Sequence, residues 1–183
     1  MQQDQITGYS EKLQIEKRYV TVTTKETLLE MVEAIEEASR ISLDTETTSL
    51  NPRKGKIIGF SITTKIGTGF YLPTLKWNNY TQKLEELLIE GKSTHNIAVR
   101  VMKMLKGKKL ICHNASFDLR YIKNYYGVSL IEDLWVDTAL LVHTVQEEGA
   151  GMGVFGLKPL AVSIQEHIGL NVEEAANIND KNK

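Results

Sequence analysis

Two acidic residues, Asp44 and Glu46, leave a short apolar run and could hold a divalent metal ion. The run Ile41–Leu43 is typical of a buried strand, and on an extended chain residues i and i+2 point to the same side, about 6–7 Å apart. Carboxylate oxygens are the ligands that hard divalent cations prefer. The alternative is that the pair only opens a solvated turn, which is the usual place of acidic residues.

A third acidic residue, Asp118, lies where a predicted strand gives way to a helix. The segment Leu110–His113 has the pattern of a buried strand, and a helix is predicted over 115–126 with Asp118 in its first turn. Asn114 or Ser116 could cap this helix, and an acid there complements the helix dipole for roughly 0.3–1 kcal/mol. Helix stability alone would therefore account for Asp118. Only its combination with the first two acids suggests a catalytic site.

The combination resembles the 3′–5′ exonuclease (proofreading) domain of family A, DNA polymerase I-like, polymerases, within the ribonuclease H-like superfamily that uses four catalytic acids. Asp44–Leu50 resembles the first motif of that family and His113–Asp118 resembles the second. Supporting matches follow in the family's order at Trp135–Leu141 and Gly156–Ala161. The resemblance covers about residues 18–175.

The resemblance implies a role for each matched residue. Asp44 would bridge two Mg²⁺ or Mn²⁺ ions, Glu46 would hold one ion and the attacking water, and Asp118 would serve the second ion. Leu50 would pack against the terminal base, and Asn114 would help to hold the penultimate nucleotide. A core leucine and a helix cap are equally good explanations of these last two residues.

Basic residues near the second motif form a second group of candidates for nucleic-acid binding. Between Lys92 and Lys123 the chain has eight Lys or Arg residues against Asp118, although its formal net charge is −1. Such a segment could attract a phosphate backbone without regard to sequence, or it could be an ordinary solvated helix face. We predict nucleic-acid contacts for Lys108 and Lys109, and for Thr47 beside the first motif.

The sequence departs from the family at the third motif, a Tyr with an Asp four residues later. The last tyrosine is Tyr126, and the His version of the motif fails because His167 is followed by Val172 at the required spacing and His143 by Glu148. We expect that a polymerase chain or fragment supplies the missing Asp, or that the chain is a fragment or catalytically impaired.

Composition excludes several other classes of protein. No run approaches the roughly 18 apolar residues of a membrane span, and Met1–Lys17 lacks the apolar core of a signal peptide. The single cysteine, Cys112, cannot form an internal disulfide. These features favour a cytoplasmic protein, and a bacterial or phage-infected cell would suit it.

The remaining patterns predict an α/β ribonuclease H-like fold: three antiparallel strands, then alternating helices and strands, in a mixed sheet flanked by helices. We expect an extension over 1–17, one domain over 18–175 and a polar tail over 176–183. The predicted strands are Tyr19–Val22, Ile41–Asp44, Ile57–Thr64, Thr68–Leu72, Leu110–His113 and Leu134–Val136. The predicted helices are 25–38 with a capping box at Thr23 and Glu26, 81–89, 94–105, 115–126, 137–146 and 158–168.

Three functions remain open at this point. The first is a metal-dependent 3′–5′ exonuclease module that acts on the 3′ end of single-stranded DNA. The second is a non-catalytic module of the same fold that binds nucleic acid or a polymerase. The third is an RNA-trimming exonuclease similar to RNase D, which shares the same acids.

Overall fold

The computed structural model describes residues 17–145, 156–157 and 160. Within it, Glu16–Leu141 forms one compact unit, which contains the sheet and the candidate site. The predicted helix over 158–168 lies outside the described residues except at 160, and the matched segment Gly156–Ala161 is described only at 156, 157 and 160. No helix in the described part of the chain is both long and apolar enough to cross a membrane.

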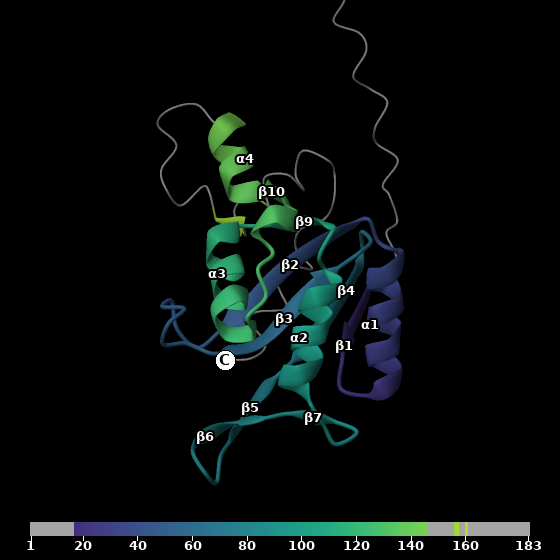
Figure 1. Cartoon of the computed structure of the whole chain (residues 1–183), viewed down its shortest axis with the longest axis vertical. Helices are drawn as coiled ribbons and strands as arrows, with labels where there is room; N and C mark the ends of the chain where they lie inside the picture. The colour runs from purple at the N-terminus through teal and green to yellow at the C-terminus, as the bar shows by residue number, and fades with distance from the viewer. Residues whose placement is uncertain (1–16, 146–155, 158–159, 161–183) are drawn as a thin grey trace, which may run out of the picture. The chain divides into compact units, whose positions relative to one another are not determined.

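A six-stranded mixed sheet forms the centre of the unit (Figure 1). Its strand order is β1-β4-β3-β2-β9-β10, in which β2, β3 and β4 pair antiparallel while β9 joins β2 and β10 joins β9 in parallel. The three antiparallel strands were predicted, and the parallel addition of β1 to β4 was not. The sheet strands are β1 Arg18–Thr21, β2 Arg40–Thr47, β3 Ile57–Thr63, β4 Thr68–Pro73, β9 Lys109–Cys112 and β10 Leu134–Asp137.

Three helices contribute to the core together with one face of the sheet. They are α1 Lys25–Glu37, α2 Thr94–Met104 and α3 Ala115–Tyr126; α4 Thr138–Val145 follows β10, and a 3₁₀ turn covers Ile131–Asp133. Ile41 and Leu43 of β2 lie in one buried cluster with side chains from all three helices. The alternate residues Ser42, Asp44 and Glu46 are exposed, so β2 has a core face and a solvent face.

The helix predicted over 81–89 is wrong, because this region forms two small hairpins. They consist of β5 Leu75–Asn78 with β6 Lys83–Glu86, and of β7 Leu88–Ile89 with β8 Lys92–Ser93. The Asn78 side chain accepts hydrogen bonds from the amides of Tyr80 and Thr81, and Glu90 and Gly91 both have positive φ. Positive φ at both central residues is typical of the type I′ turn of a two-residue hairpin, so turn chemistry prevails over the apolar spacing.

Two predicted helix caps are also wrong in detail. Thr24 caps α1 in a capping box with Thr27, in place of Thr23 with Glu26. Asn114 stands at the cap position of α3 but makes no side-chain cap, since its backbone is left-handed with φ 62° and ψ 52°. At the other end, Gly127 ends α3 with φ 70°, in agreement with the helix predicted over 115–126.

The tyrosines of α3 pack against neighbouring parts of the protein. Tyr121 and Tyr126 are buried, and Tyr125 and Tyr126 lie with their ring centroids 5.3 and 5.2 Å from that of His95 on α2. Cys112 is buried in β9, and burial raises the pKa of its thiol to about 12. Cys112 is therefore an inert core residue at neutral pH.

Candidate active site

The strand β2 carries both residues of the first acidic pair at its carboxyl end. It pairs with β3 from Ser42 to Thr47, but with β9 only as far as Ser42. Asp44 and Glu46 lie on its solvent face, and Thr45 between them is buried on the core face. Because β9 ends its pairing early, the backbone of Thr45 has an edge free for another partner.

That partner is Asp118, which comes from α3, 74 positions after Asp44. Its Oδ1 accepts a hydrogen bond of 2.9 Å from the Thr45 amide and one of 2.6 Å from the Thr45 hydroxyl. The Asp118 side chain is only 2% exposed. Since the Thr45 amide is bonded directly to Asp44, the two motifs meet at one edge of the sheet.

Burial and mutual repulsion raise the pKa values of these acids. Burial raises the pKa of Asp118, the two Thr45 donors oppose that rise, and the charge of Asp137 adds to it. The pKa of Asp44 rises to about 6, first because surrounding protein reduces its hydration and then because Asp118 and Glu46 are negatively charged. Asp44 keeps an accessible surface, so the protein shields its carboxylate only in part.

The donor set suits a divalent cation, although the carboxylates are not gathered around one point. Among the residues that the structure describes, no group of three His, Cys, Asp or Glu side chains could hold a metal ion. Asp44 and Glu46 leave β2 on its solvent face, whereas Asp118 bonds to Thr45 on the core side. Their hard oxygen atoms and their mutual repulsion nevertheless fit a site that a cation would neutralise.

Three of the residues predicted to contact nucleotides follow the two acidic motifs in the chain or lie within them: Leu50, Asn114 and Thr47. Leu50 is 88% exposed, which excludes the alternative of a core leucine. Asn114 is exposed, and its backbone N–H, rather than its side-chain amide, donates a hydrogen bond to Asp137. The Thr47 hydroxyl donates to the carbonyl of Ser49 at 3.1 Å and so shapes the start of the following loop.

Lys108 and Lys109 lie at the opposite end of β9 from His113. The Lys108 ammonium donates to the carbonyls of Glu36 and Ala38 at the end of α1, at 2.9 and 2.7 Å. The Lys109 ammonium lies 5.1 Å from the ring centroid of Trp135. Both cations thus have partners within the fold, and their contact with nucleic acid stays a prediction.

Two residues at the site were not singled out from the sequence, Asp137 and His113. The Asp137 carboxylate accepts from the amides of Asn114 and Ala115 at 2.9 and 2.8 Å and so caps α3. His113 bonds to the Thr138 hydroxyl at 2.9 Å, and its charge acts against the raised pKa of Asp44. Their positions in the sequence could have indicated them, because His113 follows β9 and Asp137 ends β10. The carboxyl ends of the parallel strands β2, β9 and β10 lie at the same edge of the sheet.

Tyr71 of β4 approaches Glu46 across the sheet. Glu46 pairs with Gly59, and a Cβ built on Gly59 would lie 2.3 Å from the Tyr71 hydroxyl oxygen. Burial, and then the charge of Glu46, raise the pKa of Tyr71. The absence of a side chain at Gly59 therefore lets a phenol lie on the same face as Glu46.

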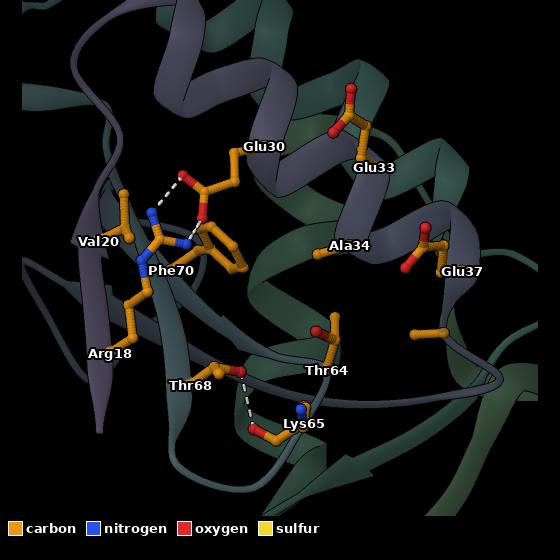
Figure 2. A pocket seen from close by; sticks show the side chains of 11 residues that line it. Arg18, Val20, Glu30, Glu33, Ala34, Glu37, Thr64, Lys65, Thr68 and Phe70 are labelled. Atoms are coloured by element: carbon orange, nitrogen blue, oxygen red, sulfur yellow. Dashed lines mark hydrogen bonds and ion pairs between the residues drawn. The ribbon is translucent and has the colours of Figure 1, made fainter. Parts of the chain in front are cut away.

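A separate cavity of about 500 Å³ lies between α1 and the strands β1 and β4 (Figure 2). Figure 2 shows Arg18 bound to Glu30 on one side of it and Glu33 and Glu37 along α1. Asp44, Glu46 and Asp118 do not line it. This cavity is therefore separate from the acidic residues of the two motifs.

Comparison with known proteins agrees with this arrangement of motifs. A model of the 3′–5′ exonuclease family of DNA polymerase A type matches residues 19–180. DNA polymerase I of Borreliella burgdorferi is 33% identical over 110 residues, which are 58% of this chain and 11% of that polymerase. The matched region thus spans a small part of the polymerase.

Two solved structures share the fold at low sequence identity. Escherichia coli RNase D, an exoribonuclease involved in structured RNA processing, is 19% identical with a TM-score of 0.53, over 86% of this chain and 36% of that one. The POL domain of Pol1 from M. smegmatis, in complex with DNA primer-template and dNTP, is 18% identical with a TM-score of 0.56, over 81% and 23%. With a family model that matches most of its length and a mixed sheet of the ribonuclease H-like type, the chain belongs to the 3′–5′ exonuclease domain family of DNA polymerase I-like polymerases.

Proposed function

We propose that this chain is a metal-dependent 3′–5′ exonuclease module that removes nucleotides from the 3′ end of single-stranded DNA, as the proofreading part of a DNA polymerase I-like enzyme in the cytoplasm of a bacterial or phage-infected cell. The observation that carries the proposal is the bonding of Asp118 to Thr45, between Asp44 and Glu46. It joins acids from two distant motifs at one sheet edge.

Asp44, Glu46 and Asp118 are the residues that would hold two Mg²⁺ or Mn²⁺ ions. Bound there, the ions would make water a stronger nucleophile and stabilise the charge that develops at phosphorus. The Thr45 donors counter the effect of burial and so favour the ionised form of Asp118. With a pKa of about 6, Asp44 is mainly ionised above pH 7, so metal affinity should fall as the pH drops through 6.

The neighbouring residues would orient the end of the strand. Leu50 offers an exposed apolar surface to a terminal base, and the Asn114 side chain is not needed as a helix cap because Asp137 replaces it. Thr47 fixes the start of the loop that presents Leu50.

The decisive experiment is metal-dependent degradation of a 5′-labelled single-stranded DNA by three proteins. They are the chain, the chain with Asp44→Ala, and the chain joined to a helix carrying Tyr-x-x-x-Asp. We expect weak activity from the first, none from the second, and at least about a 10²-fold gain in the third, because a fourth acid would complete the anionic ligands. A polymerase chain or fragment that supplies this acid should act in the same way.

Other outcomes would change the proposal. Full, Asp44-dependent activity of the unextended chain would show that another acid already serves, with Glu148, Glu173 and Glu174 to be tested. Faster cleavage of RNA than of DNA would favour an RNase D-like enzyme. Inactivity of all three proteins would contradict the exonuclease proposal.

The second candidate, a non-catalytic nucleic-acid- or polymerase-binding module, is favoured by one observation. The three carboxylates do not form a metal-ligand group among the described residues. Binding of a single strand or a polymerase that is unchanged by Asp44→Ala, by Mn²⁺ and by EDTA would support this candidate.

A further inference from the structure

A pocket of about 560 Å³ lies beside α3 on the far side of the loop that follows β2. Its lining residues come from the loop and from the helix, and they are Asn51, Pro52, Arg53, Arg120, Lys123 and Asn124. Three of the six are cations and none is acidic. All three cations are exposed, and no ion pair ties them to a carboxylate in the part of the chain described here.

The loop side of the pocket is fixed by hydrogen bonds before any ligand arrives. The Asn51 side chain accepts from the Arg53 amide at 3.0 Å, and its carbonyl accepts from the amides of Lys54 and Gly55. The loop is closed at its base by a backbone bond of 3.0 Å from the Thr48 amide to the carbonyl of Lys56. Arg53 therefore projects from a turn whose shape is already set.

The helix and the loop are locked together at Tyr121. Its hydroxyl donates to the carbonyl of Ser49. A Cβ built on Gly55 would lie 2.1 Å from the Tyr121 hydroxyl oxygen. The glycine thus allows the loop to approach α3 closely, with Arg53 and Arg120 on one shared pocket.

The helix side also presents its charges outward. The Arg120 Nε donates to the Ser116 carbonyl at 2.7 Å, which positions the guanidinium and leaves its terminal amino groups for a ligand. Lys123 in the last turn of α3 complements the helix dipole, which is the simplest explanation for that residue alone. The helix dipole does not explain why Arg53, which belongs to a separate loop, lines the same pocket as Lys123.

The pocket is distinct from the acidic edge. At 100° per residue, Arg120 and Lys123 are turned about 200° and 140° around α3 from Asp118. A helix is about 10 Å across, so the pocket is on the order of 10 Å from Asp118. In a stacked strand, which advances about 3.4 Å per nucleotide, this corresponds to about three nucleotides.

We propose that Arg53, Arg120 and Lys123 form a second binding site for the nucleic-acid strand, one that takes backbone phosphates about three or more nucleotides before the 3′ end. The strand would pass over the loop that carries Leu50. This inference rests on the proposed function for the identity of the ligand. It assigns the three residues to binding and none of them to the chemical step.

The test compares two triple variants that lose the same charge. The pocket variant is Arg53→Gln, Arg120→Gln and Lys123→Gln; the control variant is Lys25→Gln, Lys76→Gln and Lys83→Gln, exposed cations outside the pocket and outside the basic segment Lys92–Lys123. Binding of a fluorescent 12-nucleotide single-stranded DNA is measured by anisotropy in EDTA between 50 and 200 mM salt. Circular dichroism checks that both variants are folded.

We expect the pocket variant to bind the 12-mer about tenfold more weakly and to lose about 0.7 from the log–log salt slope for each phosphate contact removed. A fluorescent dinucleotide, too short to reach the pocket, should bind both variants and the parent equally. Because no hydrolysis is required, these results are independent of whether the chain is an exonuclease.

Several results would overturn the inference. They are an equal loss in the control variant, an equal loss for the dinucleotide, and no loss in the pocket variant. Stronger displacement of the 12-mer by a poly-glutamate peptide of equal charge than by unlabelled DNA would also overturn it, because the pocket would then prefer an acidic protein segment.

Discussion

The acidic edge of the sheet and the cationic pocket are joined by the loop that follows β2, yet their charged groups affect the stability of the fold differently. At the edge, burial and neighbouring negative charges raise the pKa values of Asp44 and Asp118. In the pocket, the cations project into solvent and need no compensation within the protein. Groups that must hold a cation are thus kept under electrostatic strain, whereas groups that attract a strand remain hydrated.

The first prediction concerns a substitution that disturbs the contact between the loop and α3, and it has the largest expected effect on stability. In Gly55→Ala the new methyl group would lie 2.1 Å from the Tyr121 hydroxyl and 3.0 Å from the Ser49 Cβ. We expect a loss near the upper end of the ~1–3 kcal/mol typical of overpacking, measured by urea unfolding. Adding Tyr121→Phe removes the closest atom and should recover part of the loss. A neutral Gly55→Ala would show that the loop is not held against α3.

The second prediction concerns only the acidic edge. Thr45→Val removes the hydroxyl that donates to the buried Asp118 carboxylate and should destabilise the protein by about 1–2 kcal/mol at pH 8. The same change should raise the pKa of Asp118 further, so the loss should shrink as the pH falls and Asp118 becomes protonated. Thr45→Ser keeps the hydroxyl and serves as the control. An equal loss at pH 8 and pH 4 would mean that packing, not the hydrogen bond, is responsible.

The third prediction tests the electrostatic strain at Asp44, and its effect is the smallest. The folded-state pKa of about 6 exceeds the ordinary 3.8, so the folded state binds this proton more tightly than the unfolded state does. The ionised carboxylate therefore lowers stability above pH 6, and this penalty disappears as the pH falls below about 4. In EDTA at pH 8, the Asp44→Asn variant should have a free energy of unfolding higher by on the order of 1 kcal/mol. The gain is smaller than the pKa shift alone implies, because solvent screens the charge of an accessible group.

Thermal unfolding at pH 8 and pH 4 measures this gain, with Glu33→Gln on α1 as a charge-matched control. The gain should be absent at pH 4 and absent in the control. Destabilisation of Asp44→Asn in EDTA at pH 8 would contradict repulsion at the edge and would identify Asp44 as a structural hydrogen-bonding residue.

Local patterns were sufficient to predict most of the elements around the site. The alternation through Ile41–Asp44 lies within β2, and the apolar run before His113 forms β9, as expected. The helix predicted over 115–126 is α3, which ends before Gly127. Such signals are reliable because strand alternation and a left-handed glycine depend on neighbouring residues only. The resemblance to the exonuclease family likewise came from motifs that are short and local.

The sequence alone determined which acids stand at the ends of which elements, and the tertiary structure decided what surrounds them. Spacing could not show that Thr45 holds Asp118, that Asp137 replaces Asn114 as the cap of α3, or that Arg53 joins Lys123 across a pocket. Each pair is separated by more than 20 residues, so only the packing of distant segments creates it. The helix predicted over 81–89 failed for a different and local reason, since hydrogen bonds to the Asn78 side chain and the turn at Glu90 outweigh a weak helical pattern.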